Sequence, residues 1–166
     1  MRTKILIASL VIVGLASVAY AAFSQVLTIS GTGTIAGDWD VAITGITQTS
    51  ATGVTENSAP VFTGTSATFD VDLAYPGATA TYDVTVTNNG NIPAVLTTLD
   101  GVTAANAAAP LYITYDVTGV TNGTTLAGGG ATNVATVTVE WDPASSPATT
   151  GESKTATITL SYDQDT

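Results

Sequence analysis

From Trp39 to the C-terminus, apolar and polar residues alternate in short runs that are separated by turn-forming residues. Alternation with a period of two places one face of a segment in the core and the other in solvent, which is typical of a half-buried β-strand. Turn signals such as Pro76-Gly77 and Asn89-Gly90 lie between the runs. The pattern predicts about seven strands, at residues 39–43, 69–73, 80–87, 92–96, 111–118, 135–141 and 155–162.

Three stretches of the same region lack this alternation. Residues 48–66 are polar, and we expect them to form a loop region that could hold a short extra strand. Residues 101–110 contain five alanines and favour a short helix. Residues 126–132 contain three consecutive glycines and favour a flexible loop.

Half-buried strands in this number require two sheets that close over each other, with the apolar faces between them. We therefore expect an all-β fold in which residues 36–166 form one body, an antiparallel immunoglobulin-like or jelly-roll-like β-sandwich. Trp39 and Trp141 are expected to be core residues rather than platforms for sugars.

The N-terminus has the three parts of a secretory signal peptide. Arg2 and Lys4 precede an uncharged apolar run, residues 5–18, and the sequence Ala19-Tyr20-Ala21 follows it. The apolar core of about 14 residues is shorter than the roughly 20 that cross a membrane. The sequence therefore predicts a signal peptide over residues 1–21 and a secreted protein, found outside the cell or on its surface, that meets the membrane only before cleavage. An uncleaved membrane anchor or a filament-core helix is the alternative.

Residues 22–35, directly after the expected cleavage site, have the pattern of one long strand. At about 13 residues it exceeds the usual strand length of about 5–6, and it contains neither Pro nor a charged residue. Left unpaired at a surface, such a strand is an aggregation hazard, so something must cover it. The apolar and glycine positions share one face, with Gln25 as the exception: Phe23, Leu27, Ile29, Gly31, Gly33 and Ile35.

Two hypotheses explain this segment: it is the first strand of its own sandwich, or it is a donor strand that inserts into the next subunit of a filament. Burial of its apolar side chains does not offset the entropy lost when about 13 residues become ordered, at about 1–2 kcal/mol each. The segment therefore needs ladder hydrogen bonds along most of its length, and a groove between two strands suits it better than a flat edge. Gly31 and Gly33 would let its backbone approach closely where the groove is shallow. The alternation alone does not decide between the two hypotheses.

Composition and charge exclude several functional classes. The 166 residues include no Cys and no His, and only three Lys and Arg against 13 Asp and Glu. Disulfides, thiolate or imidazole metal sites and His-dependent nucleophiles are therefore excluded, and a nucleic-acid partner is not expected. No catalytic constellation is visible, so we expect no enzyme. Removal of Arg2 and Lys4 changes the formal net charge from −10 to −12 and leaves Lys154 as the only basic side chain, so copies repel one another unless ions screen them.

Two stretches resemble a known family of secreted proteins. The join Ala19-Tyr20-Ala21-Ala22-Phe23-Ser24, which runs into a Thr-rich strand, resembles matrix-fibre proteins of the TasA and camelysin type. The sequence Tyr75-Pro76-Gly77, followed by YDVTVTNNG at residues 82–90 and NIPAVL at residues 91–96, is similar to a signature of these proteins and of many surface Ig-like repeats.

The resemblance covers the signal and roughly residues 22–46 and 73–99, and it implies a fibre or pilus subunit that polymerises by N-terminal donor-strand complementation. The donor would be residues 22–35, and the subunit interface would include the six positions of its apolar face. The protease activity described for camelysin-like proteins is not implied, because this chain has no His-Glu-x-x-His motif.

Paired carboxylates are the only candidate metal ligands. Asp38 and Asp40, and likewise Asp70 and Asp72, lie two residues apart on one face of a predicted strand. Converging carboxylates bind Ca²⁺, whereas isolated ones form solvated faces that add solubility. We expect no resident cofactor, with Ca²⁺ at these positions as the weaker hypothesis.

Two functions follow from the sequence. The first is a structural subunit of an extracellular filament or pilus, whose partners are copies of itself and which responds to divalent cations. The alternative is a monomeric or membrane-anchored Ig-like surface or adhesion module with a surface ligand.

Overall fold

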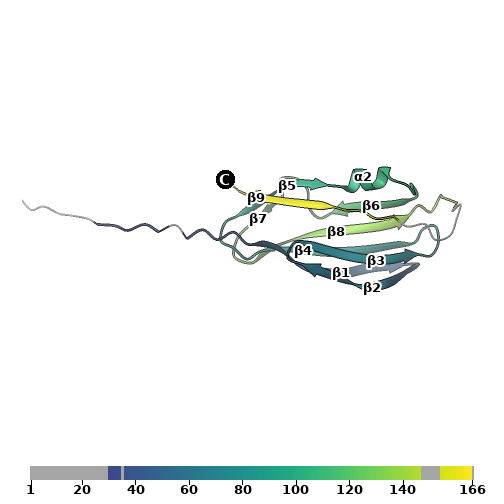
Figure 1. Cartoon of the computed structure of the whole chain (residues 1–166), viewed down its shortest axis with the longest axis horizontal. Helices are drawn as coiled ribbons and strands as arrows, with labels where there is room; N and C mark the ends of the chain where they lie inside the picture. Colours follow the sequence, from purple (N-terminus) through teal and green to yellow (C-terminus); the bar gives the residue numbers. More distant parts are fainter. Residues whose placement is uncertain (1–29, 35, 147–153, 166) are drawn as a thin grey trace, which may run out of the picture. The chain divides into compact units, whose positions relative to one another are not determined.

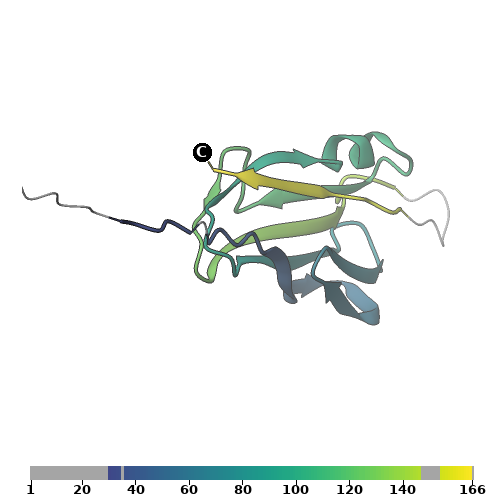
Figure 2. The same cartoon turned by 60° about the vertical axis from the view of Figure 1, so that its left-hand side comes forward.

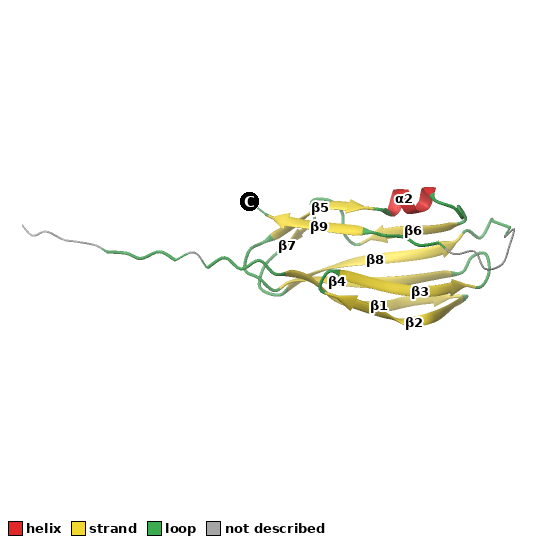
Figure 3. Ribbon diagram, in the orientation of Figure 1, coloured by secondary structure: helices red, strands yellow, loops and turns green. Residues whose placement is uncertain are grey.

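In a computed structural model, residues 30–34, 36–146 and 154–165 are described. The chain divides between Ile35 and Ala36, and the body after this point is built of antiparallel strands with one short helix among its described residues (Figure 3). This result confirms an all-β fold, and the body is sandwich-like because the sheets share one core.

The largest sheet has four strands in the order β1-β4-β8-β6 (Figure 1). They are β1 (Val41–Thr52), β4 (Thr79–Asn88), β8 (Ala131–Trp141) and β6 (Ile113–Thr118). β4 is the central strand: along its inner face Ala80, Tyr82, Val84 and Val86 are buried, as the alternation of the sequence requires.

Two smaller sheets lie over this sheet. The hairpin of β2 (Val54–Thr63) and β3 (Ser66–Leu73) is one, and the three strands β7 (Thr125–Leu126), β5 (Ala94–Asp100) and β9 (Thr159–Gln164) are the other, in the order β7-β5-β9. Figure 2 shows the blue hairpin and the yellow β9 on opposite sides, with β8 between them. Side chains of all three sheets meet in the core: Ala67 and Phe69 from the hairpin, Leu96, Leu160 and Tyr162 from the second, Val84 and Ala135 from the large sheet.

The structure corrects the prediction for residues 48–66, which are mostly strand rather than loop. β1 continues to Thr52, and β2 follows after Gly53. Most side chains of β2 are exposed, so this strand has no buried face that alternation could reveal. The other two local predictions differ in outcome: the helix α2 (Val102–Ala107) lies where the alanines favoured it, whereas β7 and β8 include part of the expected glycine loop.

The last strand begins later than the alternation suggested. Side chains alternate between partly buried and exposed from Lys154 to Leu160, but only residues from Thr159 pair with β5. No helix among the described residues is long and apolar enough to span a membrane.

Candidate functional site: a groove between two strand edges

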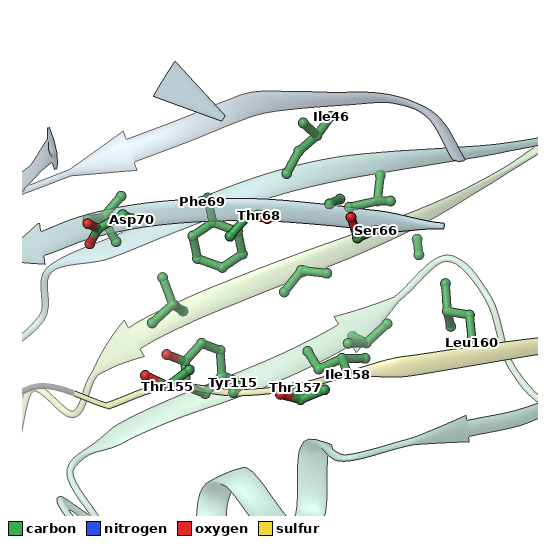
Figure 4. Close-up of a pocket in the computed structure, with 18 of the residues that line it drawn as sticks. Ile46, Ser66, Thr68, Phe69, Asp70, Tyr115, Thr155, Thr157, Ile158 and Leu160 are labelled. Atoms are coloured by element: carbon green, nitrogen blue, oxygen red, sulfur yellow. The ribbon is translucent and has the colours of Figure 1, made fainter. Parts of the chain in front are cut away.

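A groove of about 1600 Å³ lies between β3 and the segment 154–162 (Figure 4). All eight residues of β3 and all residues from Lys154 to Leu160 line it. Its volume exceeds the roughly 300–1,000 Å³ of ordinary small-molecule pockets. A groove that follows the whole length of a strand suits an extended polypeptide chain better than a compact ligand.

The floor of the groove is apolar and belongs to the four-stranded sheet. Val84 of β4, Ala135 and Val137 of β8 and Tyr115 of β6 form its centre. Ile46 of β1 also lines the groove, and in the view of Figure 4 it lies on the other side of the β3 ribbon from Tyr115. An occupant would therefore bury its inward side chains against aliphatic and aromatic carbon, which is the main source of binding free energy here.

Among the residues that the structure describes, both walls of the groove present backbone edges without a strand partner. There β3 pairs only with β2, and β9 pairs only with β5. In the described part of the chain, residues 155–158 make no backbone–backbone hydrogen bond. An added Cβ at Gly101 would collide with the carbonyl oxygen of Thr157, so in an extended chain the backbone groups of Ala156 and Ile158 point the opposite way, toward the groove. Such edges accept another strand by hydrogen bonding.

Aromatic contacts hold the β3 wall over the floor. The rings of Phe69 and Tyr82 stack with centroids 4.2 Å apart. The Tyr82 hydroxyl donates to Glu56 Oε1 at 3.2 Å and accepts from Gln48 Nε2 at 2.9 Å. Burial is the main reason that the pKa of Tyr82 lies above its ordinary value. β2 is thereby also connected to the floor, through Glu56.

The opposite wall is anchored at Lys154. Its ammonium group donates to the carbonyl oxygens of Pro110 at 3.0 Å and Ile113 at 2.6 Å, and the Tyr115 hydroxyl donates to the Lys154 carbonyl at 2.8 Å. Burial lowers the pKa of Lys154 and raises that of Tyr115. The single basic side chain of the body therefore holds this wall in place by hydrogen bonds at one end of the groove.

The other end of the groove lies where the chain enters the body, and we call it the near end. Asn91 Nδ2 donates to the Ala36 carbonyl at 2.7 Å, and Asn91 Oδ1 accepts from the Asp38 amide at 2.8 Å. Gly90 allows this contact, because an added Cβ would collide with the carbonyl oxygen of Asp38. These bonds determine the point at which the N-terminal segment leaves the body.

The candidate metal ligands do not converge in the described part of the chain. Asp70 and Asp72 share the amide of Asn57, which donates to their carboxylates at 3.2 and 3.0 Å. Asp38 and Asp40 use their carbonyl oxygens to hold the turn at residues 89–92. No group of three acidic side chains occurs among the described residues, and Ca²⁺ binding stays a prediction.

The predicted interface residues lie mostly outside the described residues, namely Phe23, Leu27, Ile29 and Ile35. Gly31 and Gly33 are described; they are exposed and belong to no strand. The prediction that Trp39 is a core residue is wrong, because 43% of its surface is exposed and its side chain lines the groove. Trp141 is partly buried and stacks on Tyr112 with ring centroids 5.6 Å apart.

Sequence reasoning identified the strands of both walls but not the gap between them. The alternation of Phe69, Val71 and Leu73, and of Ala156 and Ile158, indicates buried faces whether or not another strand lies between the two walls.

Comparison of the chain with known protein families, with curated proteins and with solved structures found no match.

Proposed function

We propose that the protein is a structural subunit of an extracellular filament, assembled when residues 22–35 of one copy fill the groove of another. The observation that carries the proposal is the groove itself, an apolar floor between two strand edges that have no partner among the described residues. A strand inserted there would pair with both edges and join the two smaller sheets.

The N-terminal segment has the properties that such an occupant needs. It is free of charge and Pro, and its apolar positions alternate. Fourteen extended residues span about 46 Å, whereas the eight residues of β3 span about 26 Å, so the segment is long enough to cover the wall. The resemblance to matrix-fibre proteins of the TasA and camelysin type supports the same assignment.

The proposal places the protein outside the cell after removal of residues 1–21. The mature chain would begin at Ala22, which leaves the donor strand at the free N-terminus. Intact mass of surface material tests this point. A mass that matches the chain from Met1 would contradict it and favour a membrane-anchored module.

Replacement of Ile29 by Asp tests the donor role, with Thr28→Asp as the matched control. Ile29→Asp places a carboxylate in an apolar groove, which costs several kcal/mol unless it protonates or the strand withdraws. The same charge at Thr28 falls on the opposite face and stays in solvent. We expect Ile29→Asp to be exported as a folded monomer without filaments, and Thr28→Asp to assemble.

A synthetic peptide of residues 22–35 provides the complementary measurement. Added to the Ile29→Asp monomer, it should raise the melting temperature, because a ligand that binds only the folded state stabilises it. Unfolding of the Ile29→Asp monomer, with no response to peptide, would instead make residues 22–35 a strand of their own body. A wild-type protein that stays monomeric at high concentration would contradict the filament and favour the surface module.

A further inference from the structure

The two walls of the groove run in opposite directions. β3 begins near the Gly64 carbonyl, which accepts from Ile43 at the near end, and it ends at Leu73. The opposite wall begins at Lys154, bonded to Ile113, and ends where the Asp165 amide donates to Pro93 at the near end. We call the end at Leu73 and Lys154 the far end. A strand between these walls is parallel to one and antiparallel to the other, and two directions are therefore open to it.

Side-chain size differs between the two halves of the groove. In the half toward the far end, the rings of Phe69, Tyr82 and Tyr115 fill the core. In the half toward the near end, the β3 wall carries Ala67 and the floor carries Ala135, and the larger side chains there, Leu160 and Tyr162, belong to the opposite wall. Figure 4 shows the Phe69 and Tyr115 rings in the same part of the groove, beside Asp70 and Thr155 and away from Ser66 and Leu160.

Side-chain size also changes along the donor segment, in the order that would complement the β3 wall. Its large inward residues, Phe23, Leu27 and Ile29, precede its two inward glycines, Gly31 and Gly33. Neither glycine has a positive φ, and an added Cβ would meet no atom within 4 Å. Neither backbone conformation nor their present surroundings therefore require glycine at these two positions.

We propose that the donor strand of a second copy runs parallel to β3 and antiparallel to the opposite wall. Leu27 and Ile29 then lie at the level of Ala67, and the two glycines lie over Phe69 and Tyr115. The reverse direction would place Phe23 and Leu27 over the rings and leave the glycines over Ala67 and Ala135. This inference rests on the proposed function and adds the direction of the donor, which decides the kind of assembly.

The direction determines whether the assembly is open or closed. In the proposed direction Ile35 reaches the far end of the acceptor, and the donor's own body follows there. The acceptor's own segment leaves from its near end, where Asn91 holds Ala36. Each copy thus donates its N-terminal strand at its near end and accepts the strand of another copy in its groove, with the donor's body at the far end. A head-to-tail contact of this kind propagates without closing. The reverse direction would bring two near ends together and permit a closed, reciprocal pair.

The surfaces that meet in the proposed direction are both partly apolar. At the far end Leu111 is 68% exposed and Tyr75 is 49% exposed, and at the near end Trp39 is 43% exposed. Stacking of one body on the next would cover these side chains, whereas pairing of two near ends would leave Leu111 and Tyr75 in water.

Paired cysteines test the direction, because the natural chain has no Cys. Thr34 and Asp72 are outward-facing and exposed, and the proposed direction places Thr34 of one copy beside Asp72 of the next. We expect Thr34→Cys/Asp72→Cys filaments, treated with a thiol crosslinker that spans about 7 Å, or two residues of strand, to give a ladder of covalent oligomers. Ser24→Cys/Asp72→Cys is the matched control and should give no crosslink.

Other crosslinking results overturn the inference in distinguishable ways. Covalent dimers from the Ser24→Cys/Asp72→Cys protein alone would establish the reverse direction while the donor role between copies stands. A crosslink within one chain of a monomeric protein would overturn the donor role as well. Filaments that give no crosslink with either pair would place the segment outside the groove.

A substitution at Gly31 gives an independent measurement. Gly31→Val would force a branched side chain against Phe69, and overpacking costs about 1–3 kcal/mol, so we expect about a tenfold or greater loss of assembly. Thr32→Val, on the outward face, is the control and should assemble normally. Normal assembly of Gly31→Val would overturn the proposed direction.

Discussion

The ring of Phe69 in β3 stacks on the ring of Tyr82 in β4, with centroids 4.2 Å apart and ring planes inclined by 15°. This contact joins two sheets that share no hydrogen-bonded strand pair in the described part of the chain, where β3 pairs with β2, and β4 pairs with β1 and β8. Offset stacking of this kind is worth about 0.5–1.5 kcal/mol beyond the buried area. The stack therefore keeps one wall of the groove at a defined distance from its floor.

Truncation of Phe69 should loosen that wall. Phe69→Ala removes the stack and leaves a cavity, and we expect the free energy of unfolding to fall by about 3 kcal/mol, the lower end of the range for Phe truncation, because the ring is only partly buried. Phe62→Ala on the neighbouring β2 is the control, since 48% of Phe62 is exposed and its loss should cost well under half as much. Urea denaturation of both variants measures the difference, and equal losses would contradict the stack as the main anchor.

Removal of the Asn91 side chain should release the point where the chain enters the body. Asn91→Ala deletes the bonds to Ala36 and Asp38, each worth about 0.5–1.5 kcal/mol. We expect the body to stay folded and the Asp38 amide to exchange its hydrogen faster. Asn89→Ala is the control, because that side chain is exposed and only its backbone bonds to Asp40. Unchanged exchange at Asp38 in Asn91→Ala would refute this role.

Alkaline pH should destabilise the protein through Tyr82 and Tyr115, whose burial raises their pKa. A raised folded-state pKa means that the unfolded state loses its proton first, so this stability is complete below about pH 10, the ordinary tyrosine pKa, and is lost as pH rises through the folded-state value. The lowered pKa of Lys154 makes stability rise with pH instead, but this is the effect of one group against that of two tyrosines.

Tyr115→Phe isolates one of these contributions. The variant loses the bond to the Lys154 carbonyl, which should cost about 1 kcal/mol at neutral pH. Above pH 10 its stability should fall less steeply than that of the wild type. Denaturation curves at several pH values measure both effects, and parallel pH profiles of the two proteins would contradict the assignment.

Assembly should respond to ions. Without residues 1–21 the chain carries a formal net charge of −12, and screening weakens repulsion between exposed charges beyond about 10 Å at 0.1 M salt. We expect light scattering to show faster assembly as NaCl rises. Any larger effect of Ca²⁺ at equal ionic strength should disappear in Asp70→Asn/Asp72→Asn if these carboxylates bind the ion. A flat response to both salts would contradict the prediction.

The sequence by itself determined which faces of the strands are buried. Side chains alternate sides along an extended chain, and the alternating apolar residues of β4 and β8 are buried in the structure: Ala80, Tyr82, Val84, Val86, Ala135, Val137 and Val139. The helix α2 was also predictable, because its alanines favour that conformation locally. β2 was not, because its side chains are mostly exposed and backbone hydrogen bonds to β3 hold it.

Only the tertiary structure decided which strand edges lack a partner. The sequence shows the same alternation around an apolar residue such as Phe69 or Ile158 whether its strand has one neighbouring strand or two. Edges consist of backbone N–H and C=O groups, which every residue except proline carries alike. The groove therefore depends on how Tyr82, Lys154 and their partners place β3 and β9. These contacts join residues that are far apart in the sequence, so the sequence pattern alone does not predict where the groove lies.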